Sequence, residues 1–191
     1  MKRMLPVVLI VLLACAAQAV AQTPKPGAEQ KRIGYFAGTW RWETNMKASP
    51  LSTAGKYVVT ETNQWLPGGF HLVSQGRNTA PRGNRFGSHA TGSQFTSHGI
   101  WTYDSANNVY IHDQYESHGG THHCTGSVAG DTWTFTCPFK ASEGTMETRW
   151  TIKEVSPTSA TFTGEIVSGP GAGSTIFEGK ATKISGRTAK K

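Results

Sequence analysis

Hydrophobic and polar residues alternate along most of the chain after residue 37. In the first such segment one face carries Trp40, Trp42, Thr44 and Met46, and the other carries Arg41, Glu43 and Asn45. A period of two is typical of a strand with one buried face. The same alternation predicts further strands at residues 55–66, 70–77, 99–103, 109–117, 145–155, 159–167 and 175–184.

Turn residues separate these segments. Pro67-Gly68-Gly69 and the polar run 104–108 are typical turn sequences. Before the first strand, Ile33, Tyr35 and Phe36 are spaced for a short helical turn. About ten short strands with almost no helix predict an all-β, antiparallel barrel or sandwich.

One hairpin can be predicted in register. Gly130-Asp131 is a two-residue turn signal, so Ala129 faces Thr132 and, further along, Cys124 faces Cys137. Apolar pairs then share one face and hydroxyl pairs share the other, as a correct register requires. Counted from the turn, Cys124 and Cys137 form a non-hydrogen-bonded pair, in which facing Cα atoms are only about 4.5 Å apart. We therefore predict a disulfide between Cys124 and Cys137.

The N-terminus has the pattern of an export signal. Two basic residues precede an uncharged apolar run, and small residues end it at Ala19-Val20-Ala21. This predicts a signal peptide over residues 1–21 and a periplasmic or secreted protein, which agrees with a disulfide. Leu12-Leu13-Ala14-Cys15 also resembles a lipobox, so a lipoprotein anchored through Cys15 is the alternative. The apolar run is shorter than the roughly 20 residues of a transmembrane helix.

Composition and charge complete the domain organisation. The chain has 191 residues and a formal charge of +7, which suits one domain. From residue 22 to 179 basic and acidic residues are equally numerous, and the excess lies at Lys180, Lys183, Arg187, Lys190 and Lys191. We expect a polar lead-in at 22–31, a barrel at 32–185 and a basic tail at 186–191. Such a tail contacts anionic surfaces weakly at most, and nucleic acid is not predicted as a partner.

Several motifs resemble a known family. They are Gly38-Thr39-Trp40, Leu66-Pro67-Gly68-Gly69-Phe70, Trp101-Thr102-Tyr103-Asp104, residues 130–135, and Thr148-Arg149-Trp150-Thr151-Ile152. In this order they resemble the bacterial domain of unknown function 1579 family, which has no established activity. The resemblance implies an antiparallel calycin-like up-and-down β-barrel of about 8–10 strands. It also implies that Trp40 plugs one end. In many such barrels an arginine of the last strand packs over this tryptophan, whereas here that strand offers Lys180 and Lys183, with Arg187 just beyond it.

Candidate chemistry is sparse. The adjacent His122 and His123 point to opposite faces of a strand, so they cannot readily share a metal, and no metal motif is present. No His follows position 123, which argues against haem, and no cofactor is predicted. Glu61, Asp113 and Glu116 are candidate acid or base groups. A one-residue shift decides whether His112 or Asp113 faces inward, and the sequence leaves that choice open.

The inward-facing aromatic residues are the remaining signal. They either fill the barrel or line a ligand cavity with a few polar groups at its mouth. For a cavity the candidate ligand-binding residues are Trp40, Trp42, Phe70, Arg77, His112, His122, Trp133 and Trp150.

Three functions compete. The first is an exported barrel that binds a small apolar ligand, and the second is a structural or envelope-associated protein with a filled barrel. The third, an enzyme using barrel-lining His and carboxylate groups, has the least support, because no nucleophile motif is present. The long connection from residue 78 to 98 is interpreted as a surface loop or a lid over the barrel mouth.

Overall fold

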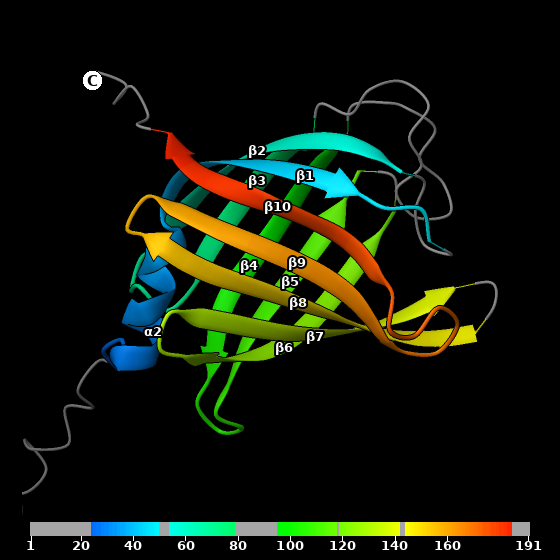
Figure 1. Cartoon of the computed structure of the whole chain (residues 1–191). Helices are drawn as coiled ribbons and strands as arrows, with labels where there is room; N and C mark the ends of the chain where they lie inside the picture. The colour runs from blue at the N-terminus through cyan, green and yellow to red at the C-terminus, as the bar shows by residue number, and fades with distance from the viewer. Residues whose placement is uncertain (1–23, 50–53, 79–94, 118, 142–143, 185–191) are drawn as a thin grey trace, which may run out of the picture.

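The computed structural model describes residues 24–49, 54–78, 95–117, 119–141 and 144–184. The expected signal peptide, the basic tail and most of the 78–98 connection lie outside these residues. The strands form a closed antiparallel barrel in which each strand pairs with its neighbours in sequence and β1 pairs with β10 (Figure 1). They are β1 (Gly38–Met46), β2 (Gly55–Trp65), β3 (Leu72–Asn78), β4 (Thr96–Asp104), β5 (Val109–Glu116), β6 (Thr121–Ala129), β7 (Thr132–Ala141), β8 (Gly144–Ser156), β9 (Ser159–Ser168) and β10 (Thr175–Ile184).

The all-β up-and-down barrel is therefore confirmed, with ten strands in the described residues. Phe70 was expected at the start of the third strand, but it lies in the connection that precedes β3. The turn is longer than the Pro-Gly-Gly signal alone suggests, because the Leu66 amide donates a hydrogen bond to the His71 carbonyl oxygen. The fourth strand begins at Thr96, three residues earlier than its alternation predicted.

A short helical segment covers one end of the barrel (Figure 1). It comprises α2 (Ala28–Arg32) and the 3-10 turn η1 (Ile33–Phe36). The helix thus begins inside the residues expected to be a polar lead-in. Gln30 explains this start, because its side chain accepts a hydrogen bond from the Gly27 amide at 2.9 Å and caps the first turn. Ile33 and Phe36 are fully buried and fill this end.

Phe36 is the centre of the closed end. Its ring stacks on Trp101 at 4.5 Å, and its carbonyl oxygen accepts hydrogen bonds from the Trp40 indole and the Asn63 amide, both at 2.9 Å. Lys183, on the last strand, places its ammonium group 5.0 Å from the Trp40 ring centroid. Lys183 therefore packs over the opening tryptophan, where many calycin barrels carry an arginine.

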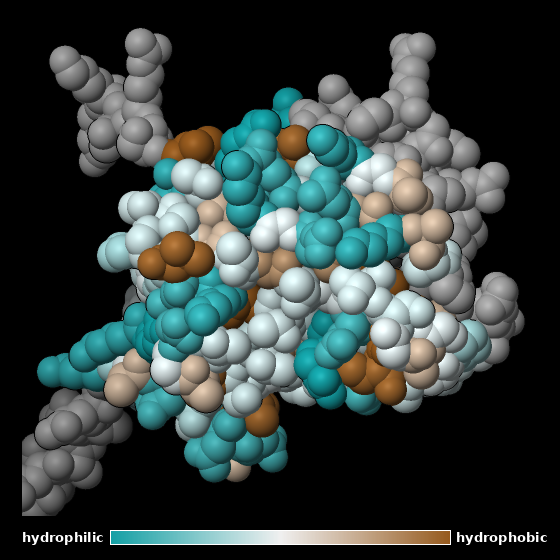
Figure 2. All heavy atoms as spheres, in the orientation of Figure 1, coloured by the Kyte–Doolittle hydropathy of each residue, from teal (hydrophilic) through white to brown (hydrophobic). Residues whose placement is uncertain are grey.

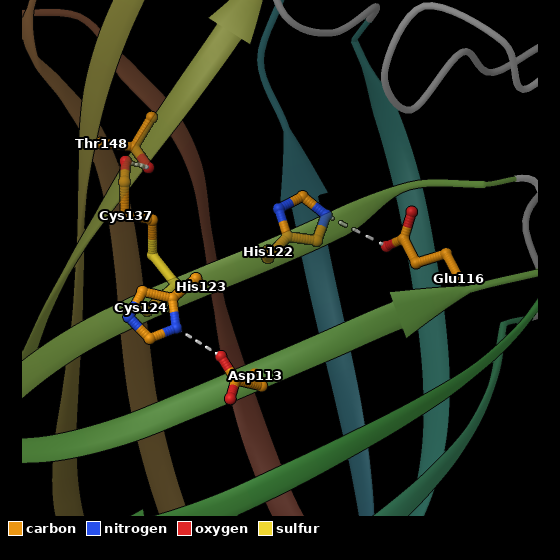
Figure 3. Close-up of a disulfide and its surroundings, with 7 residues drawn as sticks. All are labelled: Asp113, Glu116, His122, His123, Cys124, Cys137 and Thr148. Atoms are coloured by element: carbon orange, nitrogen blue, oxygen red, sulfur yellow. Dashed lines mark hydrogen bonds and ion pairs between the residues drawn. A yellow bond between two sulfur atoms is a disulfide. The ribbon is translucent and has the colours of Figure 1, made fainter. Parts of the chain in front are cut away.

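The predicted hairpin register is confirmed. Ala129 pairs with Thr132 and Gly126 pairs with Phe135, and Cys124 and Cys137 form the disulfide (Figure 3). Gly126 also shows how close the inner packing is, since a Cβ at this residue would lie 2.6 Å from the Phe135 ring. Aromatic rings packed over inward-facing glycines let a ten-strand barrel close around large side chains.

The outside of the barrel has a different character. Over the face that carries β1, β10, β9 and β8, hydrophilic and neutral residues predominate, and hydrophobic residues occur in separate spots (Figure 2). Within the described residues, the helices include none with the length and apolar character needed to cross a membrane.

Candidate functional site

A cavity of about 230 Å³ occupies the half of the barrel away from η1. Met46 and Asn78, at the ends of β1 and β3, lie along it together with Ser97 near the start of β4. These strand ends meet at the opposite end of the barrel from the Phe36 cluster. The barrel is thus filled in one half and hollow in the other.

The cavity has two chemically different walls. The wall formed by β2 to β6 holds most of the polar lining residues, beside Tyr57, Val59 and Cys124; the polar residues are Glu61, Asn78, Ser97, His112, Gln114, Glu116 and His122. The wall formed by β7 to β10 and β1 is largely apolar and carries Phe139, Trp150, Phe162, Ile176, Phe177, Trp42 and Met46. Such a cavity matches a molecule with one polar and one apolar side.

Glu61 is the most unusual group of the polar wall. Its Oε1 atom is buried and has no hydrogen-bond partner within the described part of the chain. Burial raises the pKa of Glu61 from an ordinary value of 4.5 to about 7, and a hydrogen bond from Asn63 opposes this shift only in part. Near neutral pH this carboxyl group therefore exists in both protonation states.

His112 faces the cavity, which settles the orientation that the sequence left open. Its ring stacks on Trp101 at 3.8 Å and lies 5.6 Å from the Trp150 ring. Burial, with a smaller contribution from nearby His122, lowers the pKa of His112 to about 3. His112 is therefore a neutral imidazole at physiological pH.

The neighbouring residue Asp113 points outward. Its carboxylate pairs with His123 at 2.6 Å on the outer face, and Figure 3 shows this pair on the other side of the strands from His122. On the inner face, His122 lies 3.5 Å from the Glu116 carboxylate and stacks against Phe139. The prediction that His122 faces inward with Phe139, and His123 outward, is confirmed.

Several other polar atoms beside the cavity are buried without a hydrogen-bond partner, like Glu61 Oε1. Among the described residues, the indole nitrogens of Trp42 and Trp150 and the Oδ1 atom of Asn78 are buried without hydrogen-bond partners. All three residues line the cavity. Buried polar groups without partners are costly, and this half of the barrel holds two such donors and two such acceptors.

Only half of the candidate ligand-binding residues reach the cavity. Trp42, His112, His122 and Trp150 line it. The others lie elsewhere: Trp40 and Trp133 are buried in the closed-end core, Phe70 is half-buried in a turn, and Arg77 is exposed on the outer face of β3.

Sequence reasoning missed Asn78, Ser97 and Gln114 and gave Glu61 and Glu116 no defined place. A signal was present for Asn78, which is in phase with the buried residues Leu72 and Ser74 of β3. Polar side chains in inward phase are difficult to distinguish from a shift in register, so the pattern alone did not find them.

A metal site finds no support in the described ranges, which contain no group of three or more His, Cys, Asp or Glu residues arranged to hold an ion. Glu116 and His122 are two potential ligands, but His123 points to the outside and does not join them. The two side chains contact each other at 3.5 Å within the polar wall.

Comparisons with known proteins give a limited result. No family model matches the chain, and no curated protein matches it. Among solved structures, a redesigned β-barrel is similar at 12% sequence identity, over 80% of this chain and 95% of that one, with a TM-score of 0.40. A similarity at this level does not bear on the function.

Proposed function

We propose that the protein binds a small, largely apolar ligand inside the barrel and does not transform it. The observation that carries the proposal is the cavity of about 230 Å³ beside four buried polar atoms that have no partner among the described residues. A core that served stability alone would pair these atoms or replace them with apolar groups.

The size of the cavity limits the ligand. Pockets for drug-sized molecules measure about 300–1,000 Å³, so a cavity of about 230 Å³ suits a smaller molecule. The rings of Trp42, Trp150 and Phe162 form its apolar side, with Trp42 5.9 Å from Trp150 and 5.3 Å from Phe162. A short alkyl chain or a single ring fits these contacts.

The proposal includes the location and the family. We propose an exported protein of the domain of unknown function 1579 family, either released after cleavage of residues 1–21 or anchored through a lipid on Cys15. The disulfide supports export because such bonds persist in oxidising compartments. The mass of the mature N-terminus, measured on protein from its own host, distinguishes cleavage from lipidation.

Ligand binding can be tested with tryptophan fluorescence. Trp42 and Trp150 line the cavity, so short-chain apolar compounds should change the emission. Val59→Phe fills the cavity from the facing position on β2 and should abolish this change. The matched control is Val58→Phe, one residue away, at a position that does not line the cavity. Native mass spectrometry of protein from its host should also reveal a bound small molecule.

The competing functions predict different results. If no compound changes the emission and denaturation releases no small molecule, the filled-barrel structural role replaces ligand binding. Catalytic turnover that is lost in folded His112→Ala would favour an enzyme. The very low pKa of His112 argues against it as a base near neutral pH, because a general base works best with a pKa near the operating pH.

A further inference from the structure

The charges around the cavity are unbalanced. Its acidic groups are Glu61 and Glu116, and its titratable bases are His112 and His122. His112 is neutral, and His122 lies beside Glu116. The guanidinium of Arg149, the remaining basic lining residue, is half-exposed and bonds to Glu165 at 2.9 Å. Glu61 therefore faces the cavity with no described cation beside it.

A buried carboxylate without a positive partner is costly, and a cation from outside the chain relieves that cost. The register places Glu61 diagonally across from Trp42, since Trp40 pairs with Glu61 and Trp42 pairs with Val59. Trp150 continues the aromatic surface 5.9 Å from Trp42. A carboxylate near indole rings is a favourable environment for an organic ammonium group.

We propose that the ligand of this cavity is a short apolar amine, bound as its ammonium ion to the Glu61 carboxylate with its carbon body against the aromatic wall. This inference rests on the proposed binding function and specifies its ligand class. The ammonium donates hydrogen bonds to Glu61 Oε1 and to Asn78 Oδ1, which are buried, have no partner within the described residues and belong to residues that line the cavity. The apolar body contacts Trp42, Trp150 and Phe162.

The same charges exclude other amphipathic ligands. A carboxylate ligand would meet Glu61 and Glu116 with no unpaired described cation to balance it, so like charges oppose its binding. An alcohol of equal length donates a single hydrogen bond and brings no charge. The order of affinity for equal chains is therefore amine, then alcohol, then carboxylate.

The test compares n-octylamine, n-octanol and n-octanoate by isothermal titration and tryptophan fluorescence at about pH 8. At this pH an alkylamine keeps its proton, as a lysine does, while Glu61 is largely ionised. The amine should bind about tenfold more tightly than the alcohol, and octanoate should bind more weakly than both. Glu61→Gln, which keeps the shape and removes the charge, should reduce the preference for octylamine over octanol to about twofold or less.

Two controls accompany this variant. Glu178→Gln removes an exposed carboxylate that pairs with Lys47 outside the cavity, and it should leave all three affinities unchanged. Near-ultraviolet circular dichroism verifies that Glu61→Gln keeps the native aromatic packing. Asn78→Asp supplies a second variant: it adds a negative charge to the polar wall and should strengthen amine binding further.

The results separate this inference from the binding function itself. If octanol binds as tightly as octylamine, or if Glu61→Gln keeps the preference, the cavity binds ligands but the amine inference is overturned. If octanoate binds best, the inference is overturned in the same way. If none of the three binds to the wild-type protein, both proposals are overturned.

Discussion

The two ends of the barrel use the same residue types in opposite ways. At the closed end, the Trp40 indole donates to the Phe36 carbonyl oxygen at 2.9 Å and the Trp133 indole donates to Glu154 at 2.6 Å. Beside the cavity, the indole nitrogens of Trp42 and Trp150 have no partner within the described residues.

The two ends of the barrel therefore differ in how their buried polar groups are satisfied. The closed end gains stability from dense aromatic packing with most of its polar atoms paired, although Trp101 Nε1 and Asn63 Oδ1 have no described partner there. The cavity end carries a buried carboxyl with a raised pKa and a stacked neutral histidine. Of the six buried polar atoms without partners within the described residues, four belong to residues that line the cavity.

The largest expected effect is at the closed end. Phe36→Ala removes a fully buried ring that packs on Trp101 and Trp133, and we expect it to lower the free energy of unfolding by about 4 kcal/mol. Denaturant titration measures this loss. Phe139→Ala, in the cavity wall, is the comparison and should cost clearly less. Equal losses would contradict the division between the two ends.

Removal of the disulfide should cause the second largest loss of stability. Cys124 and Cys137 both line the cavity and close a loop with a sequence separation of 13. Replacing both with Ala should lower the free energy of unfolding by about 3 kcal/mol. The variant is compared with the oxidised protein by thermal unfolding. An unchanged midpoint would mean that the strand pairing alone holds this part of the cavity wall.

Glu61→Gln should raise the free energy of unfolding, in contrast to the two changes above, and the size of this gain should depend on pH. Because the pKa of Glu61 rises from 4.5 to about 7 on folding, the folded state holds the proton more tightly, so stability is retained below about pH 4.5 and lost as the pH rises towards 7. The variant should therefore be more stable than wild type by about 3 kcal/mol at pH 8 and nearly equal at pH 4.5. Urea titrations at both pH values measure this, and a difference that is independent of pH would disprove the burial of an ionisable group.

The smallest expected effect is the difference in unfolding free energy between two tryptophan substitutions. Trp40→Phe loses a paired indole donor, whereas Trp42→Phe loses an unpaired donor beside the cavity. We expect Trp40→Phe to cost about 1 kcal/mol more. The two unfolding free energies are measured under the same conditions. If Trp42→Phe costs as much, its indole nitrogen has a partner and the cavity loses one of its polar groups.

Local patterns predicted most of the barrel but only part of the site. The Gly130-Asp131 turn was sufficient to place the disulfide, because a two-residue hairpin leaves a single register. Phe70 was misplaced because its alternation continues from β3 into a turn. His112 and Asp113 were not distinguished, since orientation on β5 depends on how that strand pairs with β4 and β6.

The sequence by itself determined an antiparallel all-β fold, a single disulfide hairpin and a neutral main body, because period-two alternation, turn residues and charge are properties of neighbouring residues. Only the tertiary structure decided that the aromatic residues separate into a filled end and a hollow end. That separation depends on which strands face one another across the barrel. Glu61 and Trp150, from distant parts of the chain, become neighbours of one cavity only when the ten strands close.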